Sequence, residues 1–346
     1  MSNRKKFVSL DDFINQALYN PKDGYYMKNN PFGSKGDFIT APNISILFSE
    51  MLAIWSVSFW QNLKSPNNIN LIDLGAGNGQ MIYDLINSFK NFPKFYNSCN
   101  FIILEKSPYL KKIQKKKLKK LKVKWINSLK NIKKGNNIFI ANEFFDALPI
   151  KQFTKINNKW FERFVKLDKN NNRFININSN IKKIEKKFGF RISSNQKFIE
   201  YSPKALDYIK IISKKINNQN GALLIIDYGD LENTMKNTLM TIRKHKVSEI
   251  FKEIKNSDIT YKVNFNLLKK IINILKLRCQ GITTQRNFLM NLGIQERAEI
   301  ISKNLPFSKK ADIYYRLNRL IGKNQMGDLF KVMVITDKKI NFKVGF

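Results

Sequence analysis

The feature that most constrains this chain is residues 69–79, INLIDLGAGNG, in which an apolar run leads into three closely spaced glycines. Residues 69–74 are short, aliphatic and not alternating, which is typical of a strand buried on both faces. Glycine lets the backbone adopt conformations, and approach a ligand, in ways that a side chain would prevent. We therefore predict a strand, a glycine loop and a helix, with a ligand bound at the first switch point of a parallel sheet.

Three more short aliphatic runs, at residues 101–104, 138–141 and 222–226, have the same character. Helical segments separate the earlier runs, which implies right-handed βαβ crossovers. The predicted fold is therefore α/β, with a doubly wound, Rossmann-like parallel sheet. The crossover helix predicted at residues 111–124 is rich in lysine, and we interpret its lysines as a solvated face.

The region before the sheet is predicted to be helical over residues 7–63. Ser9 is the expected N-cap of its first helix, and residues 46–63 form a strongly apolar helix. A linker that contains proline and asparagine follows this helix. We expect an N-terminal helical cap over residues 1–65 and a ligand-binding domain over residues 66–346.

Two stretches interrupt the alternation of strands and helices. Residues 151–200 are predicted to insert a β-hairpin, because two apolar runs flank a turn-rich segment. Residues 230–325 are predicted to be a mainly helical insertion that holds a strand near residues 278–284. Residues 329–335 are the candidate last strand, which we place at the edge of the sheet.

Composition excludes several kinds of site. The chain of 346 residues has two cysteines, Cys99 and Cys279, too far apart in sequence for a CxxC motif. Its single histidine, His245, lies among cations and is read as a surface or structural residue. Zinc hydrolases with several histidines are thereby excluded, a Ser–His triad is disfavoured, and no metal is expected. The N-terminus resembles neither a signal nor a transit peptide, and we expect a cytoplasmic protein without membrane insertion.

The net charge of +36 comes from 62 lysine and arginine residues against 26 acidic residues. The lysines are spread along the whole chain beside abundant asparagine and isoleucine, as a compositional bias would produce. Nucleic-acid binding proteins usually concentrate their cations and prefer arginine for phosphate recognition. A polyanionic partner remains the alternative interpretation.

The glycine loop has a particular spacing. Gln80 and Met81 follow it, where a dinucleotide-binding fingerprint would carry a further glycine or alanine. The compact G-x-G-x-G, with Asp73 just before it, resembles the glycine loop of methyltransferases that use S-adenosylmethionine (SAM). A different nucleotide ligand and a merely structural turn are the alternatives.

Polar residues follow the next two predicted strands. Glu105 ends the second run, where a carboxylate can accept both hydroxyls of a ribose; the alternative is an acid at a helix N-terminus. Asn142, Glu143 and Asp146 follow the third run and should face the same crevice, unless this loop only caps the strand with Phe144 and Phe145 in the core. The loop lacks the D/N-P-P-Y/F motif of many amino-group methyltransferases, which argues against DNA-adenine chemistry.

In combination, short blocks along nearly the whole chain resemble the MidA-type SAM-dependent methyltransferases, whose mitochondrial members assist assembly of respiratory complex I. The matching blocks are residues 20–26, 36–42, 75–79, 141–149, 226–229, 243–246, 283–294 and 326–331. The resemblance implies a class I methyltransferase fold with SAM as cofactor. It also implies symmetric dimethylation of an arginine in a complex I subunit, or in the equivalent bacterial NADH dehydrogenase subunit. The chain departs from the family pattern at Ala76, Asn78 and Asp230, which bears on substrate choice.

Candidate residues for each role follow from this resemblance and from the chemistry. Those expected at the cofactor are Asp73, Gly75, Ala76, Gly77, Gly79, Glu105 and Asn142, with Asp37 and Thr40 closing over it and Ser128 and Leu129 beside the adenine.

The acceptor sets a separate demand. A guanidinium stays protonated, with a pKa above ~12, so a carboxylate must orient it and accept the departing proton. Glu143 is the first choice for this role and Asp146 the second. An RNA methyltransferase, which the charge would favour, and a non-catalytic assembly chaperone remain alternative functions.

Overall fold

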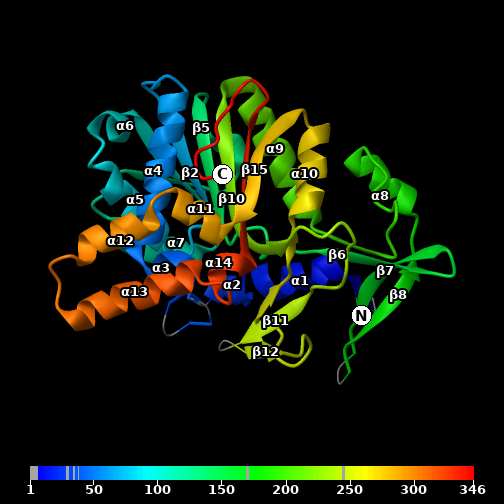
Figure 1. Cartoon of the computed structure of the whole chain (residues 1–346). Coiled ribbons are helices and arrows are strands. Elements are labelled where there is room, and N and C mark those ends of the chain that lie inside the picture. The colour runs from blue at the N-terminus through cyan, green and yellow to red at the C-terminus, as the bar shows by residue number, and fades with distance from the viewer. Residues whose placement is uncertain (1–6, 29–30, 34–35, 38, 169–170, 244–245) are drawn as a thin grey trace.

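The computed structural model describes residues 7–28, 31–33, 36–37, 39–168, 171–243 and 246–346. His245 lies outside these described residues. The centre of the molecule is an eight-stranded sheet (Figure 1). Its strand order is β15-β16-β10-β5-β2-β3-β4, and β14 also pairs with β10. These strands are β2 (Ile69–Leu74), β3 (Cys99–Leu104), β4 (Val123–Ile126), β5 (Asn136–Asn142), β10 (Gly221–Asp230), β14 (Val263–Asn264), β15 (Leu277–Thr284) and β16 (Phe330–Asp337).

The pairing of the strands decides which strand ends lie side by side. β2 runs parallel to both β3 and β5, with Asp73 opposite Ile103 and Ile140. β10 is parallel to β5, whereas β16 is antiparallel to β10. The carboxyl ends of β2, β3, β5 and β10 therefore meet at one edge, as the predicted doubly wound sheet requires.

Helices cover both faces of this sheet (Figure 1). Successive strand residues point to opposite faces, so Leu71 packs in a cluster with helices α4 and α5, and Ile72 packs in a cluster with α9 and α10. The described helices of eight or more residues are α1 (Leu10–Tyr19), α4 (Ile46–Asn62), α5 (Gln80–Phe89), α7 (Pro108–Lys117), α8 (Ile181–Phe188), α9 (Pro203–Gln219), α10 (Phe265–Ile274), α12 (Ile294–Ser302) and α13 (Phe307–Ile321). The shorter ones are α2 (Tyr25–Lys28), α3 (Ala41–Ile44), α6 (Pro93–Ser98), η1 (Leu129–Asn131), α11 (Gln285–Asn291) and α14 (Met326–Leu329). This three-layer arrangement confirms the predicted α/β architecture.

Two smaller antiparallel sheets adjoin helix α1. One has five strands, β1 (Phe7–Ser9), β6 (Lys151–Ile156), β7 (Lys159–Lys166), β8 (Arg173–Asn178) and β9 (Phe198–Tyr201). The other has three, β11 (Met240–Arg243), β12 (Lys246–Ser248) and β13 (Asp258–Thr260). α1 contacts β6, β7 and β13, and a hydrophobic cluster with Phe13, Val165 and Ile259 joins these elements. The hairpin predicted within residues 151–200 is confirmed as β7 and β8.

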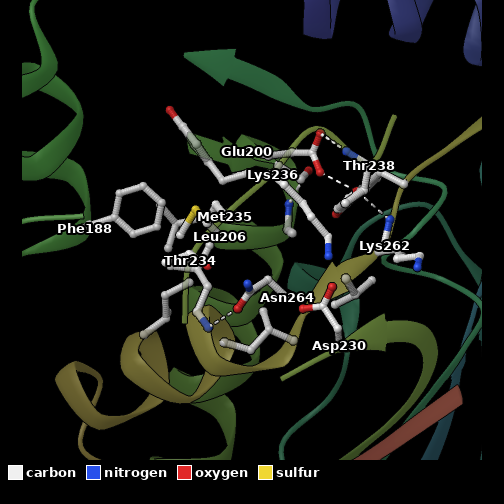
Figure 2. Close-up of a pocket in the computed structure, with 18 residues that line it drawn as sticks. Phe188, Glu200, Leu206, Asp230, Thr234, Met235, Lys236, Thr238, Lys262 and Asn264 are labelled. Atoms are coloured by element: carbon white, nitrogen blue, oxygen red, sulfur yellow. Dashed lines mark hydrogen bonds between the residues drawn. The ribbon is translucent and has the colours of Figure 1, made fainter. Parts of the chain in front are cut away.

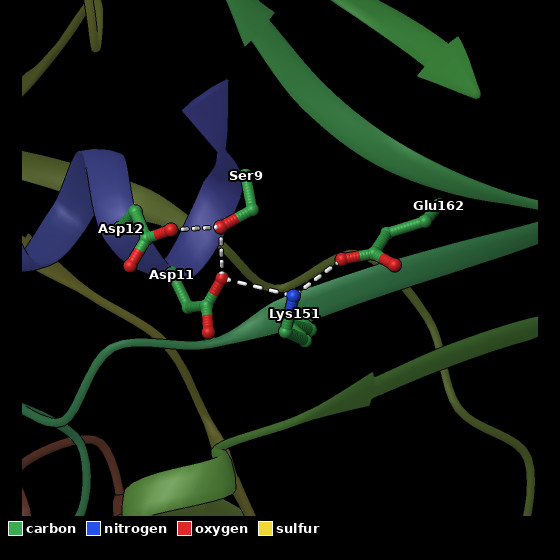
Figure 3. A network of polar contacts seen from close by, with 5 residues as sticks. All are labelled: Ser9, Asp11, Asp12, Lys151 and Glu162. Carbon is green, nitrogen blue, oxygen red and sulfur yellow. Dashed lines mark hydrogen bonds and ion pairs between the residues drawn. The ribbon is translucent and has the colours of Figure 1, made fainter. Parts of the chain in front are cut away.

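The start of the chain corrects the prediction that the helical region begins at residue 7. Residues 7–9 form β1, which pairs with β7, a contact between segments far apart in sequence. Ser9 lies at the N-cap, but its hydroxyl donates to the carboxylates of Asp11 (2.6 Å) and Asp12 (2.8 Å) instead of accepting from the helix backbone. Lys151 joins this network through Asp11 and Glu162, which ties α1 to β6 and β7 (Figure 3).

Two further segments differ from prediction. The helix expected at residues 111–124 ends at Lys117, and β4 follows because Val123 and Trp125 alternate with an exposed Lys124. The insertion at residues 230–325 is not mainly helical at its start, where it forms β11, β12 and β13. Such short strands pair with distant partners and leave little periodic signal.

The last strand is also misplaced by the prediction. β16 lies inside the sheet between β10 and β15, and β15 takes the edge. β15 precedes β16 in the chain, but it pairs with the side of β16 that faces away from β10. No local sequence pattern indicates this order. In the part of the chain that the structure describes, no helix is both long and apolar enough to cross a bilayer.

Candidate functional site

The glycine loop follows β2 directly and requires its glycines. Gly75, Gly77 and Gly79 have φ values of 74°, 53° and 78°, in the left-handed region that side chains disfavour. A Cβ atom at Gly75 would lie 3.0 Å from the Phe144 ring, and one at Gly77 would lie 3.3 Å from the Phe32 ring. The loop therefore presents bare backbone toward the crevice before α5 begins.

A small cavity of about 40 Å³ lies against this loop. It is lined by Thr40, Asp73, Ala76, Asn142 and Glu143, among others. The Oδ2 atom of Asp73 and the Oδ1 atom of Asn142 are buried and accept no hydrogen bond within the described structure. Burial, and then the neighbouring Glu105, raise the pKa of Asp73 to about 8. Two buried acceptors without donors at one cavity are suited to a ligand that brings an ammonium group.

A larger cavity of about 260 Å³ adjoins the small one, and Phe32, Gly75, Gly77 and Glu143 line both. Together the two cavities form one cleft, whose two ends we call the cofactor end and the acceptor end. The cofactor end comprises Asp73, Gly75, Gly77, Glu105 and Asn142, together with the small cavity. The acceptor end comprises Tyr19, Tyr26, Glu143, Asp146 and Asp258.

At the cofactor end, Glu105 is buried at the tip of β3, and this burial raises its pKa. Its Oε1 accepts from the Ser107 backbone N–H at 2.8 Å, and its Oε2 accepts from Gln114 Nε2 at 3.0 Å. Each carboxylate oxygen has two lone pairs, so both retain capacity for the hydroxyls of a ribose.

Gln114 is a residue that the sequence interpretation missed. Its amide also donates to the Gly77 carbonyl at 2.8 Å and accepts from Trp125 Nε1 at 2.9 Å. It thereby connects the glycine loop, Glu105 and strand β4. A signal existed, because Gln114 shares a helical face with the buried Leu110 and Leu118, where a buried polar side chain needs partners.

Glu143 follows β5 in a strained backbone conformation, with a φ of 51° in the left-handed region. Its N–H donates to the Ile226 carbonyl at 2.9 Å, which holds this conformation against β10. Its carboxylate accepts from the Ala41 backbone N–H and, at 3.4 Å, from Asn142 Nδ2. Burial and then the nearby Asp146 raise the pKa of Glu143 to about 8.

Asp227 fixes the loop that carries Asp146. It is fully buried within β10, one residue past the pairing of this strand with β5, and its Oδ2 accepts from the backbone N–H groups of Phe145 (2.9 Å) and Asp146 (3.3 Å). Burial and the charge of Asp146 raise the pKa of Asp227. Burial raises the pKa of Asp146 to about 6, against the hydrogen bond that Thr260 donates to it at 3.1 Å. The sequence interpretation quoted Asp227 within a family block but gave it no role.

Tyr19, Tyr26 and Asp258 complete the acceptor end, and the sequence interpretation missed all three. The Tyr26 hydroxyl donates to Asp258 Oδ1 at 2.9 Å, and the Tyr19 hydroxyl donates to the Ala147 carbonyl at 2.8 Å. The two rings stack with centroids 5.5 Å apart. Burial and then Asp146 raise the pKa of Asp258 to about 7.

The remaining predicted residues lie as follows. Thr40 lines the small cavity and accepts from Asn43 Nδ2 at 2.7 Å, while Asp37 accepts a hydrogen bond from the Tyr25 hydroxyl. Ser128 accepts from the Lys130 N–H at 3.3 Å, and Leu129 is buried in the core. Neither Ser128 nor Leu129 lines the two cavities, and their contact with adenine stays a prediction.

Two further predicted positions divide between core and cavity. Phe145 is in the core, whereas Phe144 lines the large cavity. Gly79 lines neither cavity but begins α5 beside Gln114.

The cofactor end fits SAM on the chemistry of its residues. The buried, partnerless oxygens of Asp73 and Asn142 suit the ammonium of the methionine part, and the glycine loop leaves room beside them. Glu105 offers acceptors for the ribose hydroxyls. Placed in this cleft, SAM supplies a methyl group on a positively charged sulfur.

Comparison with known proteins identifies the family. A family model described as "Putative S-adenosyl-L-methionine-dependent methyltransferase" matches residues 51–283. The chain is 31% identical to "Protein arginine methyltransferase NDUFAF7, mitochondrial" of Xenopus laevis, over 94% of this chain and 80% of that protein. It is 27% identical to the human protein of the same name, over 95% and 80% of the two chains.

A solved structure has the same fold. The crystal structure of a Burkholderia thailandensis protein bound to S-adenosyl-homocysteine superposes with a TM-score of 0.80 at 22% identity, covering 98% of this chain and 90% of that one. The predicted family, class of fold and cofactor are thus confirmed. This chain belongs to the family of putative SAM-dependent methyltransferases, and it is similar to the mitochondrial NDUFAF7 proteins.

Proposed function

We propose that this methyltransferase is a protein-arginine N-methyltransferase that acts on a subunit of NADH dehydrogenase and aids its assembly, in the cytoplasm. One observation carries the proposal. Three carboxylates, Glu143, Asp146 and Asp258, line the same cavity as the cofactor end. Among the described residues none of the three forms an ion pair, although the chain has 62 cationic side chains.

Buried carboxylates without cations are costly, so this acidic wall favours a cationic ligand group. SAM contributes its sulfonium, and a protonated guanidinium would contribute the second positive charge. The names of the relatives, which are protein arginine methyltransferases, support the same acceptor. Guanidinium is planar and carries five N–H donors, which several carboxylates can receive at once.

The protein's part in the reaction is alignment and proton transfer. As an acceptor nitrogen forms its bond to the methyl carbon, the carbon–sulfur bond breaks and its electron pair stays on sulfur. The nitrogen then loses a proton, which we assign to the Glu143 carboxylate. The raised pKa of Glu143 makes it a stronger base than an ordinary glutamate. The positive charge of the acceptor favours its ionised form when the acceptor is bound.

The two alternative functions, an RNA methyltransferase and a non-catalytic assembly chaperone, would require a different site. An RNA acceptor would bring phosphates, which the carboxylates Glu143, Asp146 and Asp258 would repel. A non-catalytic chaperone would not need a strained Glu143 aimed into the cavity. Strain at such a position is usually retained for function.

Labelling the natural acceptor tests the proposal. The protein is incubated with tritiated SAM and lysate from its own organism, and the labelled material is hydrolysed to amino acids. We expect the label in a protein, as methylarginine, and mass spectrometry of the labelled band should identify an NADH dehydrogenase subunit. Label in RNA or in methyl-lysine would overturn the arginine assignment, and label in methylarginine of another protein would overturn the assigned substrate.

A further inference from the structure

Asp258 reaches the acceptor end from a segment remote in sequence. It begins β13, is only 3% exposed, and lines the large cavity. The Tyr26 hydroxyl, from helix α2, donates to Asp258 Oδ1 at 2.9 Å. The Asp258 carboxylate is therefore held in place by an element 232 residues away in the sequence.

The strand that carries Asp258 is fixed on its other sides as well. β13 pairs with β11, and the Thr260 hydroxyl donates to Asp146 at 3.1 Å. Just after β13, the Lys262 N–H donates to Thr238 Oγ1 at 2.9 Å, and Thr238 in turn donates to the buried Glu200 (Figure 2). This polar network joins the segment around β13 to the five-stranded sheet. Asp258 is therefore preorganised and not part of a loose loop.

Lys106 and Lys204 also line the large cavity, but within the described residues neither forms an ion pair with its carboxylates. Lys204 lines the cavity, but its ammonium donates to Asn15 and lies 5.7 Å from the centroid of the Tyr19 ring. Lys106 lies 5.6 Å from the centroid of the Tyr208 ring. Asp258 thus has a hydroxyl donor but, within the described structure, no ion pair.

Asp258 and Glu143 lie on separate segments of the cavity wall. The described residues hold no group of three His, Cys, Asp or Glu side chains close enough to bind a metal ion. Asp146 lies between these two carboxylates, because it follows Glu143 in the same loop and accepts at 3.1 Å from Thr260, two residues after Asp258. The stacked rings of Tyr19 and Tyr26 line the same cavity as these carboxylates.

We propose that Asp258, held by Tyr26, is a specificity-determining residue that receives N–H groups of a flat cationic acceptor from a different wall than Glu143. This inference rests on the proposed arginine methyltransferase function and names the group that selects the acceptor. A guanidinium has N–H donors around its planar rim and can contact two separated carboxylates at once. An ammonium is a compact point charge and would satisfy one carboxylate at a time.

Small cations test the inference without requiring turnover. The full chain is saturated with S-adenosyl-homocysteine, and ethylguanidine or butylamine is titrated while dissociation constants are measured by NMR. We expect the wild type to bind ethylguanidine at least tenfold more tightly than butylamine. Asp258→Asn should lose roughly tenfold in ethylguanidine affinity, equivalent to one charge-assisted hydrogen bond, and should lose most of the preference.

Two further variants make the result specific. Tyr26→Phe removes the hydroxyl that holds Asp258 but keeps the aromatic ring. Its affinity for ethylguanidine should fall roughly threefold. The matched control is Asp312→Asn on the exposed surface of α13, which should change neither affinity. Unchanged affinity for S-adenosyl-homocysteine in every variant establishes that the fold is retained.

The outcomes separate this inference from the function on which it rests. Equal binding of ethylguanidine by wild type and Asp258→Asn, or no preference in the wild type, overturns the role of Asp258. In methyl transfer to the natural acceptor, Asp258→Asn should raise KM more than it lowers kcat, and the reverse split would also overturn it. Absence of methylarginine in the labelling experiment instead overturns the proposed function.

Discussion

The two ends of the cleft are built in different ways. The cofactor end is made from strand tips and a loop, and Asp73, Gly75, Glu105 and Asn142 each lie at or just after the end of a buried strand. The acceptor end takes Tyr19 and Tyr26 from the N-terminal helices and Asp258 from β13. The comparison teaches that the part holding the common cofactor is local to the sheet, whereas the part facing the acceptor adds residues from outside the sheet to Glu143 and Asp146, which follow β5.

The comparison predicts that the largest loss of turnover comes from the junction of the two ends, at Glu143. Glu143→Gln keeps the size of the side chain but removes the proton acceptor. We expect turnover to fall roughly a hundredfold or more, with the affinity for S-adenosyl-homocysteine unchanged. Tritium transfer and calorimetry measure the two quantities.

The matched control for this substitution is Glu299→Gln on the exposed face of α12, which should leave both quantities unchanged. Normal turnover by Glu143→Gln would reject Glu143 as the orienting acid and shift the role to Asp146.

The next largest effect should fall on the cofactor end alone. Asp73→Asn removes the charge that we pair with the ammonium of SAM, so SAM affinity should fall roughly thirtyfold. Ethylguanidine binding at saturating S-adenosyl-homocysteine should not change, because Asp73 belongs to the other end. Loss of both affinities would break the distinction between the ends.

Stability should depend on pH in an unusual direction. The folded pKa values of Asp73 (about 8) and Asp258 (about 7) lie above the ordinary value of 3.8. Between the unfolded pKa of 3.8 and the folded values, the folded protein therefore binds more protons than the unfolded chain. The free energy of unfolding then falls as pH rises. At these pKa values the two groups together should lower the free energy of unfolding by roughly 5 kcal/mol between pH 5.5 and 8.5, as measured by urea titrations without ligand.

Asp73→Asn cannot take up or lose this proton, and its unfolding should show a smaller loss over the same pH range. A wild type whose stability rises across this range would contradict the raised pKa values.

A smaller effect should come from Gln114, which supports the cofactor end from behind. Gln114→Leu fills the space but leaves Glu105, the Gly77 carbonyl and Trp125 without this partner. SAM affinity should fall roughly tenfold, which corresponds to about 1.4 kcal/mol, while the preference for ethylguanidine over butylamine remains. Calorimetry with SAM measures the first quantity, and an unchanged SAM affinity would show that Glu105 does not need this support.

The same contrast explains how much the sequence could predict. The buried strands, the glycine loop and Glu105 are encoded in short contiguous patterns, and the structure places them as expected. The acceptor end depends on β13 meeting α2, and nothing local to Asp258 or Tyr26 indicates that they meet. The prediction that β16 lies at the edge of the sheet was wrong for the same reason, because only its pairing with β15 places it inside the sheet. The position of Glu143 and Asp146 in the cleft could be predicted because their loop continues a buried strand.

The three bonds of the Gln114 amide carry a mechanical consequence for the outer margin of the sheet. β4 is its last strand on that side, and such strands are prone to fraying. Here Trp125 of β4 is tied through Gln114 to the Gly77 carbonyl and to Glu105. Loosening of β4 would therefore disturb Glu105, to which we assign the ribose hydroxyls, so binding of SAM should slow amide hydrogen exchange in β4.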